Sequence, residues 1–288
     1  MSDLKLFNTT EKSTWCAGCG DFGILAGIKA ALAGMDLMPH QAMLVSGIGC
    51  GSKLPHYMTV NAYNSLHGRA VPIAQGVKLA NHNLKVIIVT GDGDGYGIGA
   101  NHLMHGMRRN ADVTHVIENN QIYGLTKGQY SPTSDKGVIT SFSPEGSIES
   151  ALNPLALALA AGATFISRTF AGDVKHLTAL LQEAIKHPGY SVVDTLQPCV
   201  TYNKVNTYDW YRSRVYKVED ETGYDPTNRE KAWTLSQEWG DRIPVGILYQ
   251  VKQPTYEEQV SALKNGPLVQ QELNGRYPDY DALKEALV

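Results

Sequence analysis

Two aspartates stand inside the glycine-rich segment Gly91–Gly95, directly after an apolar run at residues 86–90. Glycines let the backbone turn sharply off a strand and bring N–H groups close to a ligand oxygen. Because the segment leads into an expected helix start, it suits a phosphate group. The carboxylates of Asp92 and Asp94 would repel a bare phosphate, and this conflict disappears if a divalent cation bridges carboxylate and diphosphate. The segment therefore predicts a metal-bound diphosphate.

The second part of this site follows the next expected strand. Between Gly93 and the pair Asn119-Asn120 lie 25 residues. Mg²⁺ prefers oxygen ligands in an octahedron that it shares with phosphate groups. Asp92 offers a charged oxygen, Asn120 a neutral amide oxygen and Ile122 a backbone carbonyl. We predict these three residues as the protein ligands of Mg²⁺.

Two other interpretations of the glycine-rich segment remain open. A G-D-G sequence also occurs in ordinary tight turns. In addition, Gly95–Ala100 matches the G-x-G-x-x-A fingerprint of dinucleotide-binding loops, and Glu118 ends the next strand where a ribose-binding acid would lie. That fingerprint belongs immediately after its strand, whereas here it starts five residues late, behind an acidic loop. An acidic loop suits a metal ion better than a naked pyrophosphate.

The chain contains four cysteines. Cys16 and Cys19 form a C-x-x-C pair before an expected helix, and Cys50 and Cys199 each follow an expected strand. Four thiolates around one site would hold either a tetrahedral Zn²⁺ or a [4Fe–4S] cluster. A structural zinc site more often uses two C-x-x-C pairs. Buried free cysteines and a redox-active C-x-x-C pair are the remaining alternatives.

These residues need a scaffold that brings them together. Short β-branched runs predict strands at residues 42–46, 86–90, 113–118, 164–167 and 191–195. Between them we expect helices at residues 22–33, 71–81, 99–109, 151–161 and 174–186. This alternation predicts an α/β fold, a parallel sheet flanked by helices on both faces. Ligands of such sheets lie outside the carboxyl ends of the strands, so the segments after the strands should meet there.

The distribution of charge and glycine divides the chain. Residues 1–200 carry 28 charged side chains and 23 of the 28 glycines, whereas residues 201–288 carry 25 charged side chains. We therefore predict a catalytic domain at 1–200 and a charged C-terminal extension at 201–288, which wraps the core or a partner subunit. The polar stretch at 124–149 lacks an obvious regular structure, and loops of that length are usually functional.

Composition excludes several classes of protein. A hydrophobic content of 43% and a charged content of 18% over 288 residues support a large core. A net charge of −3 and a pI near 6.3 argue against a dedicated nucleic-acid binder. We find no apolar run of the ~18 residues that a membrane span needs, and no signal region at residues 1–6. Four cysteines are too few for a disulfide scaffold in so long a chain. These features predict a cytoplasmic globular protein.

The G-D-G and N-N pair resembles the thiamine diphosphate motif, and together with the four cysteines it resembles the beta subunit of 2-oxoacid:ferredoxin oxidoreductases. The likeness runs from about Trp15 to Val205. It is carried by the segments Trp15–Gly20, Gly47–Cys50, Leu66–Ala70, Gly91–Gly95, Asn120–Gln129 and Gln197–Cys199. Ala17 and Gly51 depart from the family pattern, where proline and serine are frequent, but neither departure removes a ligand.

The resemblance implies a thiamine-diphosphate-binding fold and a set of site residues. Thiamine diphosphate would contact Ile48, Gly49, Cys50, Gly51, His67, Gly93, Asp94, Gly124 and Leu125. Mg²⁺ would be held by Asp92, Asn120 and the carbonyl of Ile122. One [4Fe–4S] cluster would be held by Cys16, Cys19, Cys50 and Cys199.

The reaction implied by the resemblance joins a 2-oxoacid, coenzyme A and oxidised ferredoxin to give an acyl-CoA, carbon dioxide and reduced ferredoxin, or runs in reverse. In this family an alpha subunit supplies the glutamate that activates thiamine and completes the coenzyme A site. We therefore expect a heterodimer, or a dimer of heterodimers, and an inactive isolated chain.

Lys53 and Lys127 are the cations nearest the expected cofactor loops, and we predict that they contact carboxylates of the substrate. The segment Gly124–Thr133 resembles the members that use 2-oxoglutarate more than those that use pyruvate. Two alternatives of other classes stay open: a Rossmann-type nicotinamide or flavin oxidoreductase, and a non-catalytic zinc-binding scaffold.

Overall fold

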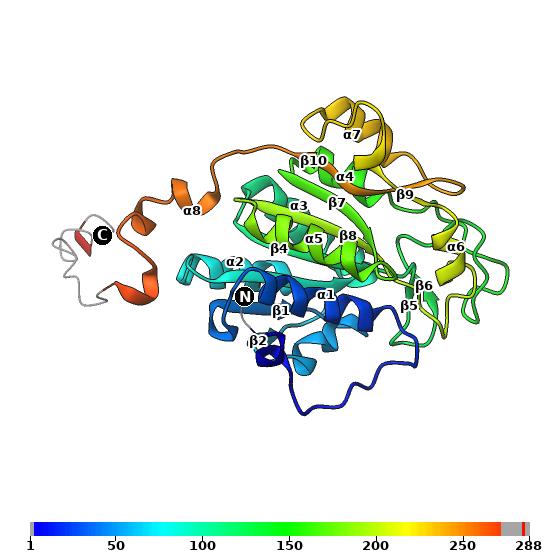
Figure 1. Ribbon diagram of the computed structural model, residues 1–288, viewed down its shortest axis with the longest axis horizontal. Helices are drawn as coiled ribbons and strands as arrows, with labels where there is room; N and C mark the ends of the chain where they lie inside the picture. The colour runs from blue at the N-terminus through cyan, green and yellow to red at the C-terminus, as the bar shows by residue number, and fades with distance from the viewer. Residues whose placement is uncertain (1–2, 272–283, 286–288) are drawn as a thin grey trace.

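The computed structural model describes residues 3–271 and 284–285. Its strands span Ala42–Ser46 (β1), Asn61–Asn64 (β2), Lys85–Gly91 (β3), Val113–Asn119 (β4), Ile122–Tyr123 (β5), Gln129–Tyr130 (β6), Phe165–Phe170 (β7), Tyr190–Leu196 (β8), Val215–Lys217 (β9) and Ile243–Gln250 (β10). Eight of them form one sheet in the order β2-β1-β3-β4-β8-β7-β10-β9 (Figure 1). The strands from β2 to β7 in this order are parallel, whereas β10 runs antiparallel to β7 and parallel to β9. Strands β5 and β6 form a separate hairpin.

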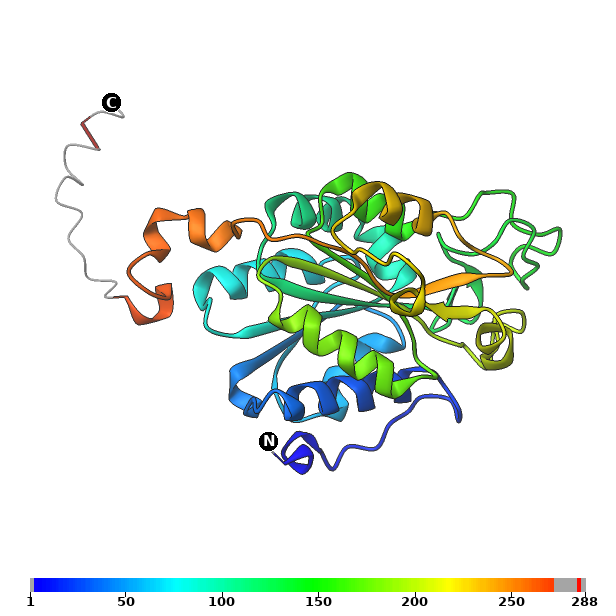
Figure 2. The same ribbon diagram turned by 45° about the horizontal axis from the view of Figure 1, so that its top comes forward.

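Helices cover both faces of the sheet (Figure 2). They span Asp21–Gly34 (α1), Ala70–Ala80 (α2), Ala100–Arg109 (α3), Pro154–Ala161 (α4), Val174–Lys186 (α5), Tyr208–Arg212 (α6), Arg229–Ser236 (α7) and Tyr256–Gln259 (α8). Short 3₁₀ helices occupy Leu4–Phe7, Pro39–Gln41, Gly51–Tyr57, Val218–Asp220, Ser261–Leu263 and Leu268–Gln270, and Gly93–Ile98 is a π-helical turn. Helices α1 and α5 pack on one face, and α2, α3, α4 and α7 pack on the other.

Strand β3 illustrates why the central strands are continuous apolar runs. Ile87 and Val89 belong to the core cluster that includes α1 and α5, whereas Val86 and Ile88 belong to the cluster that includes α2 and α3. Because successive side chains point to opposite faces, a strand covered on both sides needs apolar residues at every position.

Local signals mark the ends of the helices. Before α4, the Asn153 side chain accepts a hydrogen bond from the N–H of Ala156 at 3.1 Å, and Pro154 is the first helical residue. After α4, Gly162 adopts a left-handed conformation with φ of 83°. An Asn cap, a proline at the first position and a terminal glycine are the signals expected at a helix start and stop.

All five predicted strands and all five predicted helices occur in the structure, which confirms the parallel sheet flanked by helices on both faces. Strands β2, β5, β6, β9 and β10 were not predicted, and β6 lies within the stretch at 124–149 where no regular structure was expected. Strand β2 is a polar, exposed edge strand, and β10 contains Pro244 and Gly246, so neither carries a clear strand pattern. In the described residues no helix is long and apolar enough to cross a membrane.

The segment after residue 200 contributes to the main sheet. Strand β10 pairs with β7, and Ala232 of α7 is buried in the same core cluster as α4. Part of the predicted extension, residues 272–283 and 286–288, lies outside the described residues. The division of the chain at residue 200 and the wrapping of a partner subunit stay predictions.

Candidate active site

One cavity at the carboxyl edge of the sheet gathers the segments that follow β1, β3 and β4. We call it the acidic cavity. It is lined by Ile48, Gly49, Cys50, Gly51, His67, Gly91, Asp92, Gly93, Asp94, Glu118, Asn120, Ile122, Tyr123, Gly124, Leu125 and Thr126. Every residue predicted to contact the diphosphate coenzyme or Mg²⁺ is in this lining. The parallel strands therefore bring residues from four distant segments to one place, as the strand pattern indicated.

Asp92 and Asp94 lie at the base of the acidic cavity and are each 2% exposed. Burial raises the pKa of Asp92 to about 6, although hydrogen bonds from Ser131 and Thr133 oppose this shift. Burial also raises the pKa of Asp94, whose Oδ1 accepts a hydrogen bond from the N–H of Gly68 at 2.6 Å and contacts His67 Nδ1. Asp94 Oδ2 is buried without a hydrogen-bond partner in the described part of the chain. Buried carboxylates of this kind are suited to a cation.

The hairpin β5–β6 begins beside these aspartates. The Asn120 side chain oxygen accepts a hydrogen bond from the N–H of Ile122 at 3.0 Å, which orients it at the start of β5. The Tyr123 hydroxyl donates to the carbonyl of Gly93 at 3.1 Å. A Cβ atom on Gly93 would lie 2.0 Å from the Tyr123 ring, so only glycine permits this approach. Asp92, Asn120 and Ile122 all line this cavity, and they offer the kinds of oxygen that Mg²⁺ binds.

A second cavity, of about 190 Å³, contains all four cysteines in its lining, and we call it the cysteine cavity. A Cβ atom on Gly124 would lie 3.7 Å from Cys50 Sγ and 3.6 Å from Cys199 Sγ. Cys19 Sγ accepts a hydrogen bond from Gln197 Nε2 at 3.2 Å. All four cysteines are free thiols.

Four thiols in the lining of one cavity could hold either a tetrahedral Zn²⁺ or a four-iron cluster, whose thiolates are distributed over four metal atoms and so lie farther apart. Burial raises the pKa of Cys50 to about 11, and it also raises the pKa of Cys19. Burial thus favours the protonated form of these two thiols, and metal binding would release their protons.

Two buried acids near the cysteines were not predicted as residues of the thiamine site, and Glu118 was considered only as the ribose-binding acid of the dinucleotide alternative. Glu118 is 1% exposed and has no hydrogen-bond partner for either carboxylate oxygen within the described residues. Burial, together with the charge of Asp21, raises its pKa well above the usual range. Burial raises the pKa of Asp21 to about 7. The signal that could have revealed Glu118 is an acid at the end of an otherwise apolar, buried strand.

The two predicted lysines occupy different places. Lys53 lines the cysteine cavity, where its Nζ donates to Thr14 Oγ1 at 3.1 Å. Lys127 is exposed between β5 and β6, with a left-handed backbone at φ of 78°. It follows Leu125 and Thr126, which line the acidic cavity. A non-glycine residue held at positive φ is uncommon and often marks a functional loop.

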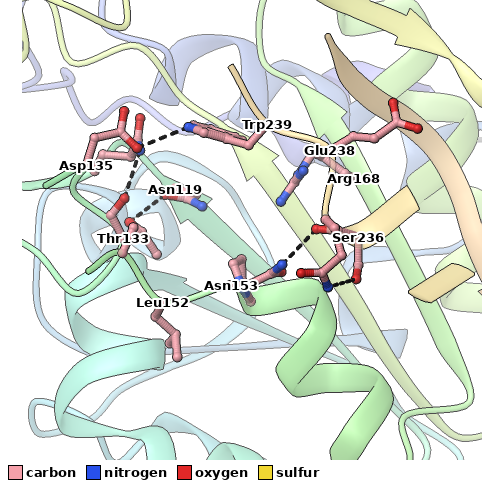
Figure 3. Close-up of a pocket in the computed structure, with 13 residues that line it drawn as sticks. Asn119, Thr133, Asp135, Leu152, Asn153, Arg168, Ser236, Glu238 and Trp239 are labelled. Atoms are coloured by element: carbon pink, nitrogen blue, oxygen red, sulfur yellow. Dashed lines mark hydrogen bonds between the residues drawn. The ribbon is translucent and has the colours of Figure 1, made fainter. Parts of the chain in front are cut away.

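A third cavity, of about 300 Å³, has Asn119 and Thr133 in its lining (Figure 3). Its lining includes Arg168 and Trp239 and none of the residues predicted from the sequence. Arg168 Nε donates to Asp194 Oδ2 at 2.8 Å, and both side chains are buried. The sequence analysis missed this ion pair because its two members come from different strands, β7 and β8.

Comparison with known proteins agrees with this geometry. Residues 42–195 match the family "Thiamine pyrophosphate enzyme, C-terminal TPP binding domain", which confirms the predicted thiamine-diphosphate-binding fold. Residues 199–265 match the family that describes the C-terminal part of the pyruvate ferredoxin oxidoreductase beta subunit.

Individual relatives point to one family. The chain is 48% identical over 265 residues to 2-oxoacid:ferredoxin oxidoreductase 1, subunit beta, of Aeropyrum pernix, covering 88% of this chain and 83% of that protein. It is 46% identical over 199 residues to 2-oxoglutarate oxidoreductase subunit KorB of Mycobacterium tuberculosis, covering 69% of this chain and 53% of that protein. The structure of 2-oxoglutarate:ferredoxin oxidoreductase from Magnetococcus marinus with 2-oxoglutarate, coenzyme A and succinyl-CoA bound superposes with a TM-score of 0.91 at 35% identity, over 98% of this chain and 96% of that one. The chain therefore belongs to the family of 2-oxoacid:ferredoxin oxidoreductase beta subunits.

Proposed function

We propose that this beta subunit serves an enzyme that converts 2-oxoglutarate, coenzyme A and oxidised ferredoxin into succinyl-CoA, carbon dioxide and reduced ferredoxin, or catalyses the reverse carboxylation. It acts with an alpha subunit, as a heterodimer or a dimer of heterodimers. The acidic cavity encloses about 80 Å³, less than the ~300–1,000 Å³ of a complete ligand pocket. A partner subunit that completes the coenzyme site accounts for this difference.

The observation that carries the proposal is a shared wall between two cavities. Cys50, Asn120, Gly124 and Leu125 line both the acidic cavity and the cysteine cavity. Bound thiamine diphosphate supplies an electron sink for decarboxylation, and a [4Fe–4S] cluster accepts electrons one at a time. A single layer of residues between the two cavities is the short separation that electron transfer between them requires.

Each cavity has residues for its own cofactor. Asp92, Asn120 and the Ile122 carbonyl would hold Mg²⁺, and Gly93 lets the backbone approach the diphosphate. Asp94 accepts a hydrogen bond from the N–H of Gly68 and contacts His67, so it connects the loop after β3 with the loop after β2. Both loops would border the diphosphate. Cys16, Cys19, Cys50 and Cys199 would hold the cluster.

The substrate assignment rests on Lys127. 2-Oxoglutarate carries one carboxylate more than pyruvate, and a cation must compensate for its lost hydration. Lys127 follows two residues that line the acidic cavity, whereas Lys53 lies at the cysteine cavity. Lys127 is therefore the better candidate for the second carboxylate.

The test compares substrates on the enzyme co-expressed with its alpha subunit. We expect Lys127→Ala to raise KM for 2-oxoglutarate far more than KM for pyruvate. Lys136→Ala, at an exposed lysine that follows β6, is the matched control and should leave both KM values unchanged. An equal increase in KM for both substrates would contradict the assignment of Lys127 to the second carboxylate of 2-oxoglutarate.

Cofactor analysis tests the rest of the proposal. An anaerobically purified complex should contain thiamine diphosphate, magnesium, iron and acid-labile sulfide, and the isolated chain should have no activity. A colourless protein with one tightly bound zinc ion would instead support a zinc scaffold. Retained nicotinamide or flavin without thiamine would support a Rossmann-type oxidoreductase.

A further inference from the structure

Two hydroxyl groups surround one oxygen of Asp92. Ser131 Oγ donates to Asp92 Oδ2 at 2.5 Å, and Thr133 Oγ1 donates to the same oxygen at 2.6 Å. Ser131, Thr133 and Asp92 are each no more than 3% exposed, so water does not compete for these bonds. Hydrogen bonds to a buried carboxylate are charge-assisted and shorter than neutral ones. The orientation of this carboxylate is thus determined by a segment that follows it by about forty residues.

The segment that carries the two hydroxyls is itself anchored. Gln121 Nε2 donates to the carbonyl of Thr133 at 2.7 Å, and Ser134 Oγ donates to the carbonyl of Gln121 at 2.5 Å. The N–H of Leu152 donates to the carbonyl of Pro132 at 2.8 Å. The hydroxyls are therefore held in place before any ligand binds, which keeps the entropy cost of orienting Asp92 low.

Thr133 also contacts a buried network of polar side chains. Thr133 Oγ1 lies 2.9 Å from Asn119 Oδ1, and Figure 3 shows both side chains on the wall of the third cavity. Asn119 Nδ2 donates to Asp194 Oδ1 at 3.0 Å, and Asp194 pairs with Arg168. Asn119 immediately precedes the predicted metal ligand Asn120. The single hydroxyl proton of Thr133 is shared between two acceptors, Asp92 Oδ2 and Asn119 Oδ1, and so connects Asp92 with the residue next to Asn120.

We propose that Ser131 and Thr133 are positioning residues, whose hydroxyl groups hold Asp92 through Oδ2 so that Oδ1 faces the cation. The inference deepens the proposed function and rests on its assignment of Asp92 as a metal ligand. Ser131 and Thr133 do not touch the cation. They act through Asp92, in the way that outer-shell partners orient metal ligands in other proteins.

The test measures the Kd for Mn²⁺, used in place of Mg²⁺, from the electron paramagnetic resonance signal of the free ion. The sample is the alpha–beta complex, freed of its divalent cation and supplied with thiamine diphosphate. Loss of an outer-shell partner typically weakens metal binding about 10–100-fold. We expect Ser131→Ala and Thr133→Val each to raise Kd by about tenfold or more. Thr133→Ser, which restores the hydroxyl, should return Kd to within about threefold of wild type.

Ser147→Ala is the matched control, because this buried hydroxyl lies farther along the loop after β6 and donates to the carbonyl of Asp135 at 2.9 Å instead of contacting Asp92. We expect it to leave Kd almost unchanged. If Ser147→Ala weakens Mn²⁺ binding as much as Thr133→Val, or if Thr133→Ser fails to rescue, the effect belongs to loop folding and the inference is wrong.

Asp92→Ala separates this inference from the proposed function. If Asp92→Ala binds Mn²⁺ as tightly as wild type, the assignment of Asp92 as a ligand fails, and the positioning role fails with it. If Asp92→Ala loses binding while Ser131→Ala and Thr133→Val keep the wild-type Kd, only the positioning role is overturned.

Discussion

Replacing Asp194 with asparagine should destabilise this protein more than any surface charge replacement. Asp194 is fully buried and accepts three side-chain hydrogen bonds: from Arg168 Nε at 2.8 Å, and from Tyr96 and Asn119 at 3.0 Å each. Asparagine preserves the shape and one acceptor, but it removes the charge that compensates Arg168, which is 3% exposed. Breaking a buried ion pair by removing one partner costs about 3–5 kcal/mol.

The matched control is Glu221→Gln. Glu221 pairs with Arg242 at 2.7 Å, but the two side chains are 47% and 56% exposed. Such surface pairs contribute about 0–1 kcal/mol. At roughly 2–4 °C per kcal/mol, Asp194→Asn should lower Tm by roughly 6–20 °C, and the control by no more than about 4 °C.

The assay is thermal unfolding of the purified complex, with both variants measured beside wild type at the same protein and salt concentrations. High salt should reduce the small decrease in Tm caused by Glu221→Gln. It should leave the decrease in Tm caused by Asp194→Asn unchanged, because screening acts mainly on exposed charges. If Asp194→Asn unfolds within about 2 °C of Glu221→Gln, the buried pair does not carry the stability assigned to it.

Three further replacements test separate features. In Gly124→Ala the added Cβ atom would lie at ordinary contact distance from Cys50 and Cys199, so the protein should fold normally. Because this methyl group would occupy space beside both sulfur atoms, the purified complex should contain less iron and acid-labile sulfide; full iron content would contradict this. Burial lowers the pKa of His115 to about 3, whereas the unfolded chain with a pKa near 6.5 takes up a proton, so acid favours unfolding. His115→Gln should therefore flatten the decline of the free energy of unfolding in urea as the pH falls from about 6 to about 4, by up to about 1.4 kcal/mol per pH unit, and parallel profiles would refute this. Gly76 lies within α2 with no atom within 4 Å of an added Cβ, so Gly76→Ala should stabilise the protein by about 0.5–1 kcal/mol in urea unfolding; a lowered midpoint would contradict it.

The strand pattern and the motifs were sufficient to predict most of the acidic cavity. Gly91–Gly95 and Asn119-Asn120 follow buried strands that lie side by side, β3 and β4. Parallel pairing then places the segments at one edge without further information. The cysteines were harder to place, since nothing in the spacing of Cys50 and Cys199 required that both lie next to Gly124.

Buried polar partners were not predictable in the same way. Glu118 and Asp194 each end or interrupt an apolar strand, which indicates a special role but names no partner. Ser131 and Thr133 lie in a polar loop whose sequence has no period, so nothing local indicates that they reach Asp92. Strand β10 was missed because Pro244 and Gly246 weaken its pattern, and it is the pairing with β7 that specifies it.

The amino-acid sequence by itself determined which chemical groups this protein offers and the order of its strands and helices, because motifs and periodicity are properties of neighbouring residues. Only the tertiary structure decided that the acidic and cysteine cavities share Cys50 and Gly124, and that Ser131 and Thr133 donate hydrogen bonds to Asp92. Those contacts join residues that are far apart in the chain, and their distances depend on how the whole sheet twists and packs. Side-chain chemistry is local, whereas the geometry that makes it a site is a property of the complete fold.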